Sequence, residues 1–225
     1  MLNKIKIAII LGLAVFAVGS AEAAFNTDII GQTAITSFEA IAELLPAAPD
    51  EASGTWVLTA PDGSARFAWR RDASDARLYD AWIWFDAKPF ADAGLDVSKL
   101  PVGMVSGDEI VLGTKLSKEP LVYDGEVSPV ASFAQIVKLD RESIGYHAAL
   151  DHYGITFVEG TLFEWAKDVS TNDKDIVFVL NPQIFIDAGV DPSKVRGWTF
   201  AKVPVEDARG RKLDADKFLK PFDLK

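Results

Sequence analysis

Residues 90–99 read Phe-Ala-Asp-Ala-Gly-Leu-Asp-Val-Ser-Lys, and residues 185–194 read Phe-Ile-Asp-Ala-Gly-Val-Asp-Pro-Ser-Lys. The second stretch lies 95 residues after the first. Each copy follows a short apolar run, Trp82–Phe85 in one case and Ile176–Leu180 in the other. Runs of this length, rich in aromatic and β-branched residues, are typical of a strand buried on both faces. The stretch therefore predicts a strand followed by a short helix and a turn, used twice.

The polar residues and glycines of the repeat have local backbone roles. Gly94 and Gly189 stand where a helix most often needs a residue with positive φ to stop. Asp96 and Asp191 are placed to cap a further helical turn with their carboxylates. These positions indicate a structural joint rather than a catalytic site.

The similarity between the two halves extends beyond the joint. Ser37-Phe38 recurs 95 residues later as Ser132-Phe133, and Phe67-Ala-Trp69 recurs 96 residues later as Phe163-Glu-Trp165. Self-similarity at a nearly fixed spacing indicates an internal duplication. We therefore expect an α+β protein of two tandem homologous units, with antiparallel hairpins and short helices, packed as one body with pseudo-twofold symmetry.

The N-terminus predicts export. Basic residues precede an uncharged apolar run over residues 7–18, and Ala21-Glu22-Ala23 then supplies small residues in an A-x-A arrangement. This is the pattern of a secretory signal peptide, and the apolar run is too short to span a membrane. We assign residues 1–23 to the signal peptide and expect a periplasmic or secreted protein. Residues 24–124 then form the first unit and residues 125–225 the second.

Composition limits the classes of function. The chain has no cysteine, which excludes disulfides, thiolate metal ligands and a cysteine nucleophile. It carries 33 acidic and 23 basic residues, for a net charge of −10. An acidic chain is not expected to bind nucleic acid, because the phosphate backbone is bound by basic residues. No later stretch is long and apolar enough to cross a bilayer. The expected partner is a small molecule or an extracytoplasmic protein.

Both histidines lie in one short segment, Gly145-Tyr-His-Ala-Ala-Leu-Asp-His-Tyr153. The sequence predicts helices over residues 37–45, capped by Ser37, and over a longer region, residues 132–153. On a helix, His147 and Asp151 would share a face, and His152 would lie about 100° away. Together with Tyr146 they could bind a metal ion. The alternative is a histidine paired with an aspartate near the end of a helix.

Trp82 and Trp84 are two residues apart, so on a strand they point to the same side. The corresponding residues of the second unit are Val177 and Val179. A tryptophan pair in one unit only could form a stacking platform for a sugar or another planar ligand. It could equally fill the core, where large aromatic residues are common.

No nucleophile elbow, metalloprotease, phosphate-loop or dinucleotide-binding motif is present. The sequence therefore favours a non-catalytic binding or interaction protein with an unidentified ligand and cofactor, bound in a groove between the units. The candidate ligand-binding residues are Trp82, Trp84, Tyr146, His147 and Asp151. One alternative is a metal or haem carrier that uses His147, Asp151 and His152. The other is a carboxylate-dependent glycan hydrolase.

Overall fold

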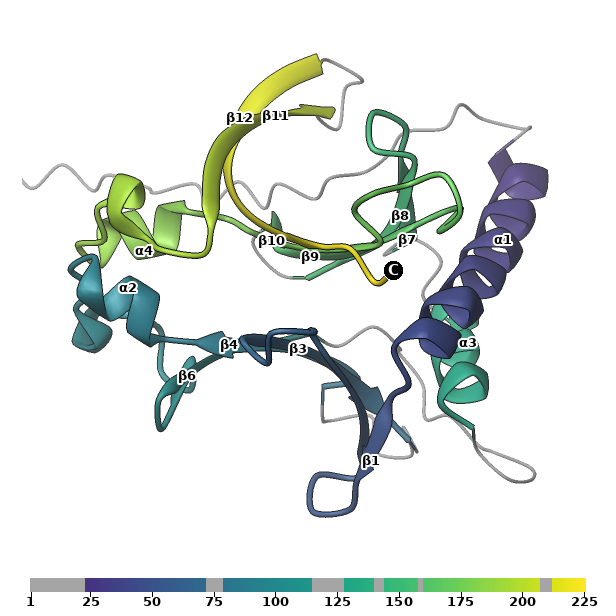
Figure 1. Ribbon diagram of the computed structural model, residues 1–225, viewed down its shortest axis with the longest axis horizontal. Coiled ribbons are helices and arrows are strands. Elements are labelled where there is room, and N and C mark those ends of the chain that lie inside the picture. Colours follow the sequence, from purple (N-terminus) through teal and green to yellow (C-terminus); the bar gives the residue numbers. More distant parts are fainter. Residues whose placement is uncertain (1–22, 72–78, 115–127, 140–143, 158–159, 207–211) are drawn as a thin grey trace, which may run out of the picture.

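The computed structural model describes residues 23–71, 79–114, 128–139, 144–157, 160–206 and 212–225. In it, two six-stranded antiparallel sheets lie face to face. Two longer helices lie at one end of this pair of layers, and two short helices lie at the other end (Figure 1). The fold is therefore of the α+β class.

Sheet A is built from residues 48–114, with the strand order β1-β2-β3-β4-β6-β5. Its strands are β1 (Ala48–Asp50), β2 (Thr55–Thr59), β3 (Ala65–Arg70), β4 (Ala81–Asp86), β5 (Val105–Ser106) and β6 (Glu109–Thr114).

Sheet B is built from residues 144–222, with the strand order β7-β8-β9-β10-β12-β11. Its strands are β7 (Ile144–His147), β8 (His152–Thr156), β9 (Leu162–Ala166), β10 (Ile176–Leu180), β11 (Thr199–Glu206) and β12 (Lys212–Phe222). When the strands of each sheet are numbered from one to six in chain order, both sheets have the strand order 1-2-3-4-6-5. The long hairpin β11–β12 bends away from sheet A and arches over the outer side of sheet B (Figure 1).

Helix α1 (Ala23–Leu44) precedes sheet A, and α3 (Pro129–Leu139) precedes sheet B. The short helices α2 (Lys88–Asp92) and α4 (Gln183–Asp187) follow β4 and β10, and each leads to a 3₁₀ turn, Val97–Lys99 or Pro192–Lys194. None of the described helices is long and apolar enough to cross a membrane. The predicted signal peptide and the predicted boundary between residues 124 and 125 lie outside the described residues, apart from Ala23.

Each long helix packs on the sheet of the other unit. Helix α1 contacts β7 and β9 of sheet B, whereas α3 contacts β3 of sheet A. The indole Nε1 of Trp165 in β9 donates to the hydroxyl of Ser37 in α1, at 2.9 Å. The indole Nε1 of Trp69 in β3 donates to the hydroxyl of Ser132 in α3, also at 2.9 Å. The helices are therefore exchanged between the sheets.

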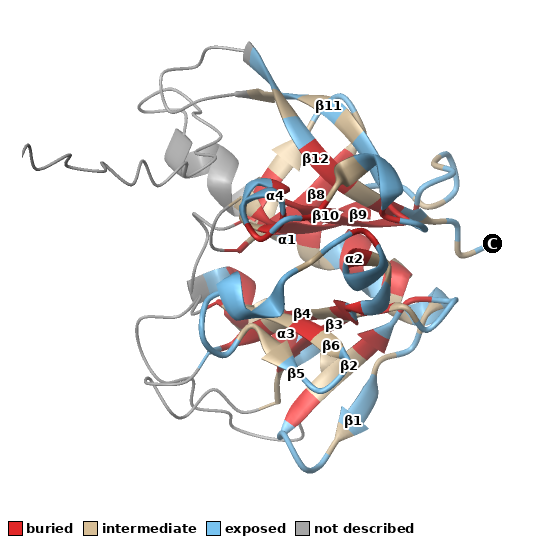
Figure 2. Cartoon of the chain, turned by 90° about the vertical axis from the view of Figure 1, so that its left-hand side faces the viewer, coloured by how far each residue is buried: buried red, intermediate tan, exposed pale blue. Residues whose placement is uncertain are grey.

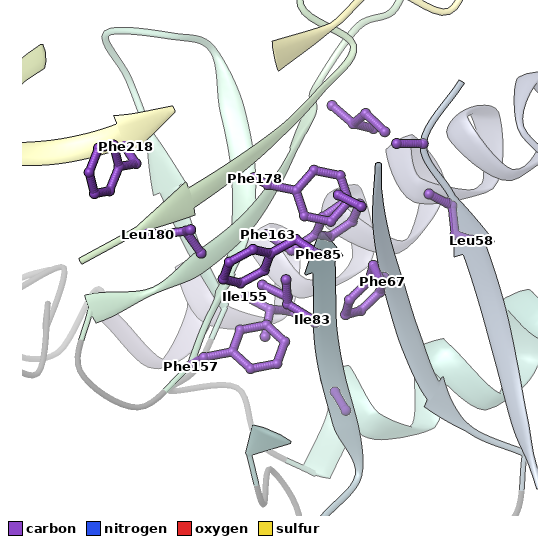
Figure 3. Close-up of a cluster of buried hydrophobic side chains, with 14 of the residues drawn as sticks. Leu58, Phe67, Ile83, Phe85, Ile155, Phe157, Phe163, Phe178, Leu180 and Phe218 are labelled. Carbon is purple, nitrogen blue, oxygen red and sulfur yellow. The ribbon is translucent and has the colours of Figure 1, made fainter. Parts of the chain in front are cut away.

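The core lies between the two sheets and is made largely of aromatic rings (Figures 2 and 3). Phe38 of α1 stacks on Phe133 of α3, with ring centroids 3.7 Å apart. Phe67 of β3 stacks on Phe163 of β9, with ring centroids 4.2 Å apart. All four side chains are fully buried. Their burial removes apolar surface from water, which stabilises the packing of the two sheets.

The repeated stretch forms a joint at the other end of the molecule. Gly94 and Gly189 have φ of 106° and 100°, which confirms that both positions need positive φ. Asp96 donates its backbone N–H to Ala188 at 2.8 Å, and Asp191 donates its own to Ala93 at 2.9 Å. The carboxylates of Asp96 and Asp191 cap the 3₁₀ turns, as predicted. The joint thus ties the two units together through paired backbone hydrogen bonds.

Three expectations about local structure are wrong. Helix α1 begins at Ala23 rather than at Ser37, and the Ser37 hydroxyl bonds Ala34 and Trp165 instead of capping the helix. The helix predicted over residues 132–153 ends at Leu139, and the two histidines lie in the hairpin β7–β8. Strand β4 is buried on only one face, because its residues alternate between buried and half-buried, whereas β10 is buried on both.

The close approach of Gly94 to Gly189 gives a test of the joint. A Cβ added at Gly94 would lie 2.9 Å from the carbonyl oxygen of Gly189. We expect Gly94→Ala to lower the free energy of unfolding by about 2–4 kcal/mol, from backbone strain plus the steric clash. Urea denaturation measures this change.

Gly103 is the matched control, because its φ of 90° is similar but a Cβ there would meet nothing within 4 Å. Gly103→Ala should cost about 1–2 kcal/mol, from backbone strain alone. Equal costs for the two variants would show that the contact between Gly94 and Gly189 does not hold the units together.

Candidate functional site

The predicted groove between the units is filled, because the core side chains of the two sheets meet there (Figure 3). A hollow of about 220 Å³ remains where the end of α1 meets the start of α3. It is lined by Glu39, Ala42, Glu43, Pro46, Ala47, Pro129 and Val130. No buried polar atom lacking a hydrogen bond lies among these residues. The outer faces of the two sheets are therefore the remaining candidate surfaces.

The outer face of sheet A carries the predicted tryptophan pair. Trp82 and Trp84 of β4 are half-buried and alternate with the core residues Ile83 and Phe85, so they point away from the core. The guanidinium of Arg66 lies 4.3 Å from the ring centroid of Trp84. This stacking covers one face of the Trp84 ring.

Arg66 is also held by an acid of β6, the strand on the far side of β4. Its guanidinium donates to the carboxylate of Glu109 at 2.6 Å, across β4. The cation on this face is therefore already paired. The tryptophan face offers half-buried rings but, among its described residues, no free charge that would select a ligand.

The outer face of sheet B carries the two histidines side by side. In the hairpin β7–β8, His147 lies directly opposite His152, so both side chains point to the same face. Asp151 forms the turn with a φ of 54°, which is uncommon for a residue other than glycine. The hairpin therefore brings together two imidazoles that a helix would have placed about 140° apart around its axis.

Glu164 lies between these imidazoles. It is on β9, directly opposite Gly154 of β8, and its Cγ would lie 3.0 Å from a Cβ built on that glycine. The Glu164 carboxylate can therefore pass over Gly154 towards β7. One oxygen lies 3.4 Å from Nδ1 of His147, and the other lies 3.7 Å from Nδ1 of His152. We call His147, His152 and Glu164 the His–Glu–His cluster.

The His–Glu–His cluster is buried and incompletely hydrogen-bonded. The side chain of His152 is 0% exposed and that of Glu164 is 5% exposed, whereas that of His147 is 19% exposed. Within the described chain, Nε2 of His147, both ring nitrogens of His152 and Oε2 of Glu164 have no hydrogen-bond partner. Leaving a buried polar atom unpaired costs about 1–3 kcal/mol. His147 is the most exposed of the three side chains, although its Nε2 atom is itself buried.

The electrostatics of Glu164 keep it ionised. Burial by itself would raise the pKa of this carboxyl group, but the contacts with His147 and His152 outweigh that effect and lower the pKa below its usual value. The fold therefore holds a buried carboxylate in its charged form at neutral pH.

Lys217 of β12 is a buried basic residue associated with the same face. Its ammonium donates to the backbone carbonyl of Gly160 at 2.7 Å, which ties the arching hairpin to the turn between β8 and β9. Burial lowers the pKa of Lys217, while the charge of Glu164 acts to raise it. The lysine therefore lies within electrostatic reach of the carboxylate.

Asp151 is separate from the cluster. Its carboxylate accepts a hydrogen bond from the hydroxyl of Tyr146 and lies 3.9 Å from Nζ of Lys167. The bond to Asp151 is the main reason that the pKa of Tyr146 rises to about 12. In the parts of the chain that are described, no group of three or more histidine and acidic side chains could hold a metal ion. The ligand set of His147, Asp151 and His152 proposed from the sequence is not assembled.

Two members of this site were missed by the sequence analysis, Glu164 and Lys217. A signal for Glu164 exists, because it is a lone acid in an otherwise apolar strand, and acids are almost never fully buried unless paired. In β3, Ala68 precedes Trp69 as Glu164 precedes Trp165 in β9. Lys217 has no such signal, since it lies in a run of alternating charged residues.

Comparison with known proteins identifies no relative of this chain. The chain matches no protein-family model, and neither the curated proteins nor the solved structures contain a significant match.

The lowered pKa of Glu164 predicts acid sensitivity. Its carboxylate stabilises the folded state above the unfolded-state pKa of about 4.3, and this stabilisation is lost as the pH falls through the lower folded-state pKa. We expect Glu164→Gln to make the loss of unfolding free energy below about pH 4.3 shallower, by up to about 1.4 kcal/mol per pH unit. Urea denaturation at a series of pH values measures the slope.

Glu43→Gln is the control for losing one negative charge, because Glu43 is an exposed residue of α1. If wild type and Glu164→Gln lose stability with the same slope, the carboxylate is not held in its charged form by the two histidines.

Proposed function

We propose that this chain is an exported, non-catalytic binding protein, and that its ligand site is the outer face of sheet B at the His–Glu–His cluster. The observation that supports this site most strongly is that His147, His152 and Glu164 contain buried polar atoms with no hydrogen-bond partner among the described residues. A molecule that supplies the missing hydrogen bonds would recover the cost of burying these groups. The partial exposure of His147 gives such a molecule a point of entry.

We further propose that the two units are tandem homologues related by a pseudo-twofold axis. The common strand order of the two sheets supports this relation. So do the reciprocal hydrogen bonds, in which Trp69 and Trp165 each reach a serine of the other unit's helix. In this view the ligand site arose in the second unit alone, because Ala68 stands where that unit has Glu164.

The alternatives drawn from the sequence have less support. Glycoside hydrolysis needs two carboxylates on either side of a sugar, whereas Glu164 lies between two imidazoles. The metal alternative relied on Asp151, whose carboxylate is engaged by Tyr146. A binding role, in contrast, requires no residue beyond the buried His–Glu–His cluster.

A thermal-shift screen tests the proposal. A panel of amines, alcohols, carboxylates and sugars is added to the mature protein, and the melting temperature is measured. A ligand present at 100 times its Kd should stabilise the fold by about 2.7 kcal/mol, or roughly 5–10 °C for a chain of this size. The same ligand should give little or no shift with His152→Asn.

Trp84→Val is the matched control, because the corresponding residue of sheet B is Val179 and a sheet of this kind accepts valine there. Trp84→Val should leave the ligand-induced rise in melting temperature unchanged. A shift that survives in His152→Asn and disappears in Trp84→Val would move the site to sheet A. A well-folded protein with no hit over the whole panel would contradict a binding function.

A further inference from the structure

The outer face of sheet A, which faces away from sheet B in Figure 1, carries aromatic side chains that the proposed function does not use. Trp82 and Trp84 of β4 are half-buried on this face, and Tyr79, two residues before the strand, is 52% exposed. We call these three residues the aromatic row. Neighbouring apolar side chains that remain partly in water are typical of a surface that binds another molecule.

The neighbours of Trp82 leave room for the aromatic row. Trp82 lies directly opposite Ala68 of β3 on one side and Gly113 of β6 on the other. A Cβ built on Gly113 would lie 2.9 Å from Cε2 of Tyr79 and 3.0 Å from Cδ1 of Trp82. Both rings therefore lean over the glycine, and a side chain at this position would push the Tyr79 ring away.

Stability of the sheet does not account for the two tryptophans. Strand β10 has the same place in the strand order of sheet B, and it carries Val177 and Val179, which are almost completely buried. Valine is thus sufficient at this place in a sheet of this fold. Sheet A has larger rings there and leaves them partly in water, an arrangement that favours contact with a ligand.

The charged pair beside Trp84 is balanced and accessible. Arg66 stacks on the Trp84 ring and donates to the carboxylate of Glu109, and both charged side chains are partly exposed. A guanidinium only donates hydrogen bonds and a carboxylate only accepts them, so together they suit hydroxyl groups, which do both. Because the two charges offset each other, the pair favours a neutral ligand over a charged one.

The aromatic row runs along the strand, which sets the length of its ligand. The Cα atoms of residues two apart on a strand, such as Trp82 and Trp84, are separated by about 6.5 Å. Tyr79 extends the row beyond Trp82. A sugar ring packs the C–H groups of one face on an aromatic ring, while its hydroxyl groups remain free at the edge. Linked sugars repeat this pattern along a chain.

We infer that the outer face of sheet A binds a neutral glycan chain. The sugar rings pack on Tyr79, Trp82 and Trp84, and their hydroxyl groups bond to Arg66 and Glu109. This surface is separate from the proposed ligand site on sheet B and does not depend on it.

Calorimetry with the full mature protein at pH 7.5 tests the inference. The probes are the neutral hexasaccharides cellohexaose, xylohexaose and chitohexaose, together with glucose as a single sugar and hexagalacturonate as a charged chain. We expect at least one neutral hexasaccharide to bind roughly tenfold or more tighter than glucose, because it contacts several rings at once. Hexagalacturonate should bind more weakly than that hexasaccharide, since the chain itself carries a net charge of −10.

Two variants locate the binding surface. Trp82→Val, which introduces the residue type of β10, should raise the Kd for the hexasaccharide roughly tenfold or more. Tyr79→Ala should raise it about threefold or more, and the exposed position of Tyr79 preserves the fold. Phe200→Val is the matched control, because Phe200 is a 39% exposed aromatic residue of β11 in sheet B. It should leave the Kd unchanged.

Circular dichroism shows whether Trp82→Val is folded, and if it is not, Tyr79→Ala decides. The inference is wrong if no hexasaccharide binds, if glucose or hexagalacturonate binds as tightly, or if the folded variants of the aromatic row bind like wild type. His152→Asn should also bind the hexasaccharide like wild type. If His152→Asn alone loses binding, the glycan lies at the His–Glu–His cluster, which would support the proposed function and overturn this inference.

Discussion

The helix that covers each sheet comes from the other unit, and this exchange sets the geometry of the whole molecule. Helix α1 precedes sheet A in the chain but packs on sheet B, and α3 does the reverse. The exchange is held by the stacked rings of Phe38 and Phe133, and by one indole-to-serine hydrogen bond on each side. Neither sheet can bury its inner face without the other unit, so the two units are expected to fold as one body.

The exchange also leaves the outer faces of the two sheets as the candidate functional surfaces. Because aromatic rings fill the space between the sheets and helices close its two ends, the chemistry that the chain can offer lies on the sides that face away. These sides differ sharply. Sheet A presents Trp82 and Trp84 with a paired arginine, whereas sheet B buries Glu164 between two histidines. A buried charge is unfavourable for stability alone, which is why the face of sheet B is the better candidate for a ligand.

The sequence predicted the joint well and the histidine segment badly, for a physical reason. The caps Asp96 and Asp191 and the glycines Gly94 and Gly189 act within a few residues of themselves, so local chemistry determines them. The hairpin β7–β8 depends instead on its pairing with β9, which is a contact between distant residues. Pairing of the strands overrode the helical spacing of His147 and Asp151. The same pairing placed Glu164 of β9 beside the histidines, a contact that the spacing of residues along the chain does not reveal.

Hydrogen exchange in a single core variant tests the exchanged packing most directly. Phe133→Ala removes a fully buried ring from α3, which belongs to the second unit in sequence but packs on sheet A and stacks on Phe38. If the units fold as one body, protection of the backbone amides should fall by a similar factor in β3 and in β9. Loss of protection in only one of the two sheets would contradict the account.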